Sequence, residues 1–142
     1  MEQDRLALSD LAGYEVVGMA YPGGRGPLYD ERVVRLVKEH TGIRYARAVK
    51  PSGSFDVQTE LLTFQPTIHH HHHHQEMMEH AERFLSMKAD TPQIFYIWGH
   101  AYEFDISDEW AEFEEFCRYI SGRSDVFYGT NREVLLPEEY CE

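Results

Sequence analysis

The sequence contains few cysteines, few basic residues and no long apolar run. Only two of its 142 residues are cysteine, Cys117 and Cys141, and their separation fits neither a CxxC pair nor a zinc-ligand spacing. We therefore expect reduced thiols and a cytoplasmic protein. No stretch of about 18 apolar residues exists, and the N-terminus lacks a basic region followed by an apolar segment. The sequence therefore predicts neither export nor a membrane span.

Positive charge is also scarce. The chain has 13 Lys and Arg against 25 Asp and Glu, which gives a formal net charge of −12. This charge repels phosphate backbones and anionic lipids, so we expect no nucleic-acid partner and no membrane partner. Eight of the nine histidines and most of the acidic residues fall in the second half, over residues 67–142. Because 42% of the residues are hydrophobic, we expect one folded domain over residues 1–142.

Hydrophobic periodicity and turn residues predict alternating strands and helices. We expect strands at residues 14–20, 43–49, 60–64, 93–98, 126–129 and 134–136, and helices between Asp30 and Thr41, over 77–85 and between Ser107 and Gly122. This order predicts an α/β fold with mostly parallel strands, because parallel neighbours need helical crossovers. Functional residues in such folds collect in loops after the strands, here 21–27, 65–74 and 99–106. Residues 137–142 are expected to form a flexible tail.

The most unusual feature is a run of six consecutive histidines, from His69 to His74. Neutral imidazoles bind zinc or nickel, and several can chelate from an extended segment. The run lacks the fixed ligand spacing of a structural zinc site, and its position before a predicted helix indicates a solvated polyhistidine loop. One interpretation is adventitious metal binding or an inserted affinity tag. The other is that one or two of the first histidines line a pocket.

A second candidate site follows the predicted strand at 93–98. His100 comes directly after this strand, and Glu103 and Asp105 are close enough in sequence to orient or charge its imidazole. His100 is therefore well placed to act as a general acid or base near neutral pH. The alternative is that His100 only caps the strand and hydrogen-bonds to the next helix.

The glycine-rich loop at 21–27 is a third candidate. Its backbone N–H groups can hold an oxyanion, a phosphate or a carboxylate. The loop has neither the GxxxxGK[ST] pattern of a phosphate loop nor the GxGxxG spacing of dinucleotide folds, so a plain turn fits its composition equally well.

Five segments together resemble the polysaccharide deacetylase superfamily (NodB-like, carbohydrate esterase family four), in particular a bacterial branch of it. The segments are GMAYPGG at 18–24, GIRYAR at 42–47, QPTIHH at 65–70, FYIWGHAYEFD at 95–105 and FYGTN at 127–131. They occur in family order across nearly the whole chain. The resemblance implies a distorted (β/α) barrel, an acetylated sugar or polysaccharide as substrate, and hydrolysis of its acetamido groups with a divalent metal, most often zinc.

The resemblance also implies roles for individual residues. Gly23 would stabilise the tetrahedral oxyanion through its backbone N–H, and His100 would be the general acid that protonates the leaving amine. The residues implied for substrate binding are Tyr21, Trp98, Tyr102, Glu103 and Asp105. The metal candidates in this chain are His69 and His70. The family's paired aspartates are absent, and HxxxH spacing occurs only inside the histidine run, at His69/His73 and His70/His74, after the glycine-rich segment and not before it as in the family. Ala20 stands where the family has an arginine.

The missing motifs predict that the chain corresponds to the C-terminal half of a deacetylase and is inactive by itself. A complete (β/α) barrel takes about 200–250 residues. Half a barrel leaves an open sheet edge, so we expect self-association. Two other functions stay open: a non-catalytic carbohydrate-binding or scaffold module, and a metal-binding protein that uses the histidine run.

Overall fold

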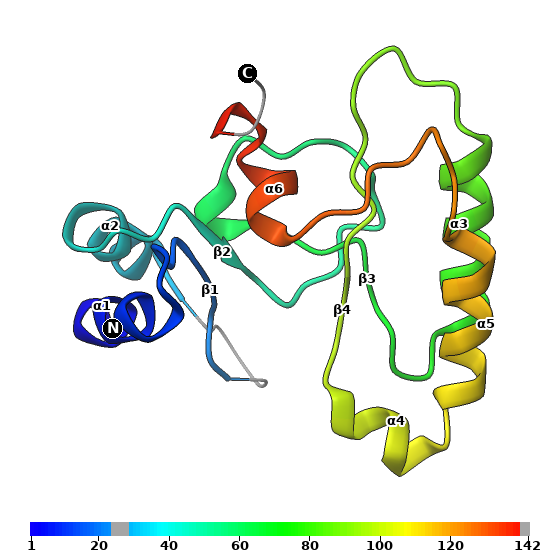
Figure 1. Cartoon of the computed structure of the whole chain (residues 1–142), viewed down its shortest axis with the longest axis horizontal. Helices are drawn as coiled ribbons and strands as arrows, with labels where there is room; N and C mark the ends of the chain where they lie inside the picture. The colour runs from blue at the N-terminus through cyan, green and yellow to red at the C-terminus, as the bar shows by residue number, and fades with distance from the viewer. Residues whose placement is uncertain (24–28, 140–142) are drawn as a thin grey trace. The chain divides into compact units, whose positions relative to one another are not determined.

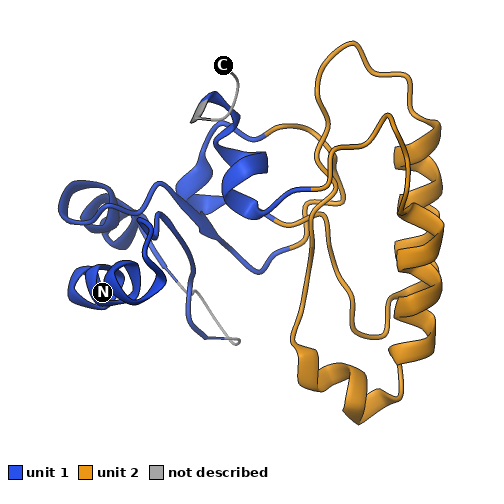
Figure 2. Cartoon of the chain, viewed as in Figure 1, with its two compact units in different colours: residues 1–50, 58–65, 129–142 blue, residues 51–57, 66–128 orange. Residues whose placement is uncertain are grey.

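The computed structural model describes residues 1–23 and 29–139 and divides the chain into two compact units (Figure 2). Unit 1 consists of Met1–Lys50, Gln58–Gln65 and Gly129–Glu142, and unit 2 consists of Pro51–Val57 and Pro66–Tyr128. The described residues form six α-helices and two parallel sheets of two strands each. None of the described helices is long and apolar enough to cross a membrane.

Unit 1 contains a short parallel pair of strands and three α-helices (Figure 1). Its elements are α1 (Glu2–Ala12), β1 (Gly18–Ala20), α2 (Glu31–His40), β2 (Tyr45–Arg47), the 3-10 turn η1 (Leu61–Thr63), α6 (Asn131–Leu135) and the 3-10 turn η2 (Pro137–Glu139). The register of β1 and β2 places Gly18 opposite Tyr45 and Met19 opposite Ala46. The helix α2 begins as expected, because the Asp30 carboxylate accepts a hydrogen bond from the Val33 N–H at 2.8 Å.

Unit 2 is a β-α-β unit followed by two helices. Its elements are β3 (Ile68–His69), α3 (His74–Ser86), β4 (Ile97–Trp98), α4 (Ala101–Ser107) and α5 (Trp110–Ile120). Figure 1 shows α3 and α5 side by side, and their contact buries one core cluster of Ile68, Met77, Ala81 and Phe116. Met77 and Ala81 are four residues apart and so share one face of α3, which accounts for the predicted apolar stripe.

The pairing of β3 with β4 places two of the predicted functional loops together. The strands are parallel, with Ile68 opposite Ile97 and His69 opposite Trp98. Their C-terminal ends therefore lie at the same edge of the sheet, with the histidine run after β3 and the 99–102 segment after β4.

Several predicted elements are confirmed, and others are wrong. Helices α2, α3 and α5 and strands β1, β2 and β4 occur where expected, although the strands are shorter. The predicted strand at 134–136 is wrong: Thr130 and Glu133 form a capping box that starts α6, with the Glu133 carboxylate 2.7 Å from the Thr130 N–H. The strand at 126–129 is absent from the described residues, and 60–64 contains the 3-10 turn η1, where Phe64 alone bridges to Arg47.

The α/β class with parallel strands is confirmed, whereas the barrel is not. Among residues 1–23 and 29–139 the two sheets have two strands each and close no barrel. The partial (β/α) barrel and self-association through its open edge therefore stay predictions. In the expected tail, residues 137–139 form η2, and residues 140–142, including Cys141, lie outside the described residues.

Candidate metal centre

The histidine run is built into unit 2. His69 ends β3, His74 begins α3, and the His70 side chain between them is buried, with 7% of its surface exposed. The His70 imidazole stacks on the Phe104 ring with centroids 4.1 Å apart. The prediction of a solvated loop is therefore wrong for this part of the run, because strand pairing and aromatic packing fix its first residues. The interpretation that the first histidines line a pocket agrees with this burial.

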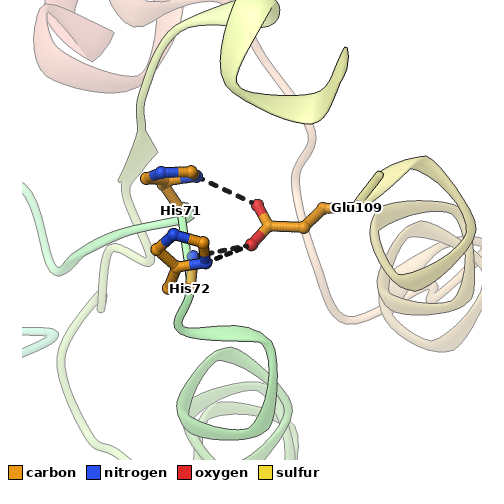
Figure 3. A group of neighbouring side chains, drawn as sticks. All are labelled: His71, His72 and Glu109. Atoms are coloured by element: carbon orange, nitrogen blue, oxygen red, sulfur yellow. Dashed lines mark hydrogen bonds and ion pairs between the residues drawn. The ribbon is translucent and has the colours of Figure 1, made fainter. Parts of the chain in front are cut away.

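The Glu109 carboxylate of unit 2 contacts the next two histidines of the run, His71 and His72 (Figure 3). His71 Nδ1 lies 3.2 Å from one carboxylate oxygen, and His72 Nδ1 lies 2.9 Å from the other. The backbone N–H of His72 also donates to that second oxygen, at 2.9 Å. The two ring nitrogens and a carboxylate oxygen all lie within 4.8 Å of one another, so this His71–His72–Glu109 group can hold a metal ion.

Two backbone outliers adjoin this group. Among the described residues, His72 (φ 58°) and Asp108 (φ 54°) are the non-glycine residues with a left-handed backbone. The conformation of His72 turns both its N–H and its imidazole towards Glu109, and Asp108 immediately precedes Glu109. Left-handed backbone costs about 1–2 kcal/mol for most residues and tends to occur at functional sites. Its presence on both sides of the same contact favours a functional role for the group.

The charge state of Glu109 suits a metal ligand. Burial by itself would raise the pKa of Glu109, but the hydrogen bonds from the His72 N–H and the His71 imidazole outweigh burial and lower this pKa overall. The carboxylate is therefore held in its ionised form, which is the form that binds a cation. The His72 side chain is 67% exposed, so the group also opens to solvent.

Glu103 joins the histidine run to the segment that follows β4. One oxygen of its carboxylate lies 3.5 Å from His69 Nε2 and 3.2 Å from His70 Nε2. The same oxygen accepts a hydrogen bond from the His100 backbone N–H at 2.8 Å. Burial is the largest influence on His69 and lowers its pKa, with Glu103 acting in the opposite direction. The structure thus brings together Glu103 and both predicted metal candidates, His69 and His70.

The other predicted residues of unit 2 lie around this contact. His100 precedes α4 and is exposed, and its imidazole stacks on Tyr102 with centroids 5.1 Å apart. Tyr102 is 57% exposed, whereas Trp98 is half-buried and packs edge-on against His69. Asp105 accepts a hydrogen bond from the Trp110 indole at 2.7 Å. Glu103 therefore holds the backbone of His100, and Asp105 is engaged with an indole.

The predicted residues of the glycine-rich loop belong to unit 1. Tyr21 is buried, its hydroxyl donates to the Leu62 carbonyl at 2.9 Å, and its ring stacks on Tyr29. Burial, followed by the neighbouring Tyr29, raises the pKa of Tyr21. Gly23 adopts φ 110°, which favours glycine, and the following residues 24–28 lie outside the described residues. The oxyanion role of Gly23 and the substrate role of Tyr21 stay predictions.

Sequence reasoning missed Glu109. In the sequence Glu109 is one of several acidic residues at the start of the helix predicted after Ser107, and 36 residues separate it from His72. Glu109 lies between α4 and α5, and the folding of unit 2 brings it beside the run. The one available signal is coarse: most acidic residues and eight histidines share the second half of the chain.

Comparisons with protein-family models, with curated proteins and with solved structures find no match to this chain. The described geometry itself offers imidazole and carboxylate donors from two distant segments, a combination that could hold a metal ion.

Proposed function

We propose that this chain is a metal-dependent carbohydrate N-deacetylase whose divalent ion, most often zinc in the family it resembles, binds at His71, His72 and Glu109. The observation that carries the proposal is the parallel pairing of β3 and β4, which sets the histidine run and the segment containing His100 at one sheet edge. The sequence resemblance suggests the reaction, and the His71–His72–Glu109 group gives the ion a place to bind.

The donor set fits a catalytic zinc ion. Catalytic zinc sites use three protein ligands and keep a fourth position for water or substrate. Zinc–ligand bonds of about 2.0–2.1 Å place tetrahedral ligands about 3.3 Å apart. The contacts of Glu109 with His71 and His72, at 3.2 and 2.9 Å, involve its two different oxygens, and the three donor atoms of the group lie within 4.8 Å of one another. The side chains would therefore rearrange to hold one ion.

The roles of the chain's own groups follow from their exposure and contacts. A bound zinc ion would polarise the acetamido carbonyl and activate water. Glu109, whose pKa is lowered, supplies the negative charge that holds the cation. The exposed His100 imidazole can deliver a proton to the leaving amine, since its backbone is fixed by Glu103. Tyr102, stacked on His100, offers an exposed flat ring to the sugar.

Release of acetate from an N-acetylglucosamine oligomer tests the proposal. The missing family motifs predict an inactive chain, but an ion held by His71, His72 and Glu109 would replace the missing metal site, so we expect wild type with added zinc or cobalt to be active. We expect His100→Ala to reduce kcat by roughly 10²–10⁴, the range for loss of a general acid. Glu109→Gln should abolish metal-dependent activity. His40→Ala is the control, because His40 is an exposed histidine of unit 1 that is not part of the group.

Two results would contradict this proposal. Acetate release that is unchanged in His100→Ala would remove the assigned general acid. A wild-type chain that binds zinc through Glu109 yet releases no acetate would favour the second candidate, a non-catalytic metal-binding protein, which the convergence of His71, His72 and Glu109 supports without any substrate.

A further inference from the structure

A small pocket in unit 2 shares Glu109 with the proposed metal centre. Its polar lining consists of His70, His74, Glu109 and Glu112, and the rest of its wall is apolar. Its free volume is about 10 Å³, which admits one water-sized occupant. The proposed centre uses neither His70 nor His74, so the pocket is a separate feature.

The two histidines of the pocket have unsatisfied ring nitrogens. His70 is more than nine-tenths buried, and its Nδ1 has no hydrogen-bond partner. Its Nε2 is 3.2 Å from a Glu103 oxygen but is not aligned for a hydrogen bond. His74 Nδ1 is likewise buried without a partner, while its Nε2 lies 3.4 Å from Glu115. Buried polar atoms are nearly always paired in folded proteins, so unpaired nitrogens on two residues that line one pocket point to a ligand.

The chemistry of the lining identifies the class of ligand. Imidazole nitrogens together with carboxylate oxygens suit zinc, cobalt and similar divalent ions. His70 and His74 are four residues apart across the start of α3. Glu109 and Glu112 are three residues apart at the start of α5, which places them on neighbouring positions of one helix face. Glu112 adds a second carboxylate to the shared Glu109, and this negative charge favours a cation beside the apolar wall.

We propose that this pocket is a second divalent-cation site, formed by His70, His74 and Glu112 together with the shared carboxylate of Glu109. Unit 2 then holds two ions with Glu109 between them. The four donors are more widely spread than the 4.8 Å that encloses the His71–His72–Glu109 group, so His74 and Glu112 change rotamer on binding. Both can do so, because His74 is partly exposed and Glu112 is exposed.

Metal stoichiometry of the full chain tests this site. The protein is stripped with a chelator, dialysed against Zn²⁺ and freed of excess ion, and zinc per chain is measured by elemental analysis. We expect two ions in wild type and one in His74→Ala, in Glu112→Gln and in His71→Ala. Glu109→Gln should weaken both sites. His40→Ala, a control at an exposed histidine of unit 1, should keep two ions.

The second site is supported if removing His74 and Glu112 lowers the zinc content by one ion per chain. A His74→Ala/Glu112→Gln double variant that binds as many ions as wild type, whether one or two, overturns the second site. Circular dichroism shows whether each variant is folded. His74 and Glu112 are mutated in preference to His70, because His70 is buried and its loss could unfold the protein. Titration with Co²⁺ gives an independent readout, in which wild type should show two phases of d–d absorbance and His74→Ala one.

The second site is tested separately from the proposed deacetylase activity, because metal content reports on it without any substrate. A chain with two ions and no acetate release keeps the second site and loses the proposed function. A double variant with the zinc content of wild type, together with metal-dependent acetate release by wild type, does the reverse.

Discussion

The absence of a side chain at position 99 allows His70 to lie where it does. A Cβ on Gly99 would overlap the His70 imidazole, at its Cδ2 and Nε2 atoms. The requirement is for space, since Gly99 is not among the glycines with a positive φ. Glycine at position 99 therefore leaves room for the side chain of His70, which directly follows the neighbouring strand β3. It does so at the point where Glu103 and Phe104 also contact His70.

Replacing Gly99 by alanine should destabilise the protein through His70. We expect Gly99→Ala to lower the free energy of unfolding by roughly 1–3 kcal/mol, the range for overpacking a filled site. Urea denaturation measures this change. The control is the same substitution in a His70→Ala background, where the overlap no longer exists and the cost should largely disappear. An equal cost in both backgrounds would show that His70 is not the residue displaced.

Local sequence signals predict some helix boundaries of this chain but not the junction between α4 and α5. The capping residue Asp30 predicts the start of α2, and the apolar stripe over residues 77–85 predicts α3. Both helices are therefore predictable from local chemistry. No glycine or proline marks the end of α4. There Asp108 takes a left-handed conformation, and the Glu109 N–H bonds to the Phe104 carbonyl at 3.0 Å. The sequence therefore predicts a single helix after Ser107 that includes Glu109. In the structure Glu109 instead lies just before α5, at its N-cap.

The same tertiary contacts explain what else the sequence could not predict. His71 and His72 become candidate ligands only because Glu109, far along the chain, is held beside them. Spacing within a uniform run of histidines carries no such information, so the first two histidines were the natural choice. The approach of the histidine run to the segment after β4 was predictable, because parallel strands share one functional edge.

Backbone strain at this junction is testable at Asp108. We expect Asp108→Gly to stabilise the protein by roughly 0.5–1 kcal/mol, since relief of the left-handed conformation exceeds the extra backbone entropy of glycine in the unfolded state. Zinc binding should be unchanged, because Asp108 is not part of the metal group. Ser107→Gly, one residue earlier at the end of α4, is the matched control and should destabilise. Destabilisation by Asp108→Gly, measured by urea denaturation, would show that the conformation at this residue is not strained.

At the scale of the whole molecule, the proposed metal chemistry belongs to one unit. Every donor of both proposed metal sites comes from the turn after β3, from α3 or from the start of α5, all within Pro66–Tyr128. Unit 1 is assembled from segments on either side of this stretch in sequence, Met1–Lys50, Gln58–Gln65 and Gly129–Glu142. A ligand that binds only the folded form of unit 2 should therefore stabilise unit 2 directly.

Hydrogen exchange can locate that stabilisation. Zinc at 100 times its Kd stabilises the form that binds it by about 2.7 kcal/mol. If the units open separately, this gain should slow amide exchange in α3 and α5 and leave exchange in α1 and α2 unchanged. We expect that result, because α1 and α2 belong to unit 1 and supply no donor. Glu109→Gln, which lacks the shared carboxylate, should lose the protection while keeping the apo exchange pattern. Equal protection of α1 and α2 by zinc would instead show that the two units open together.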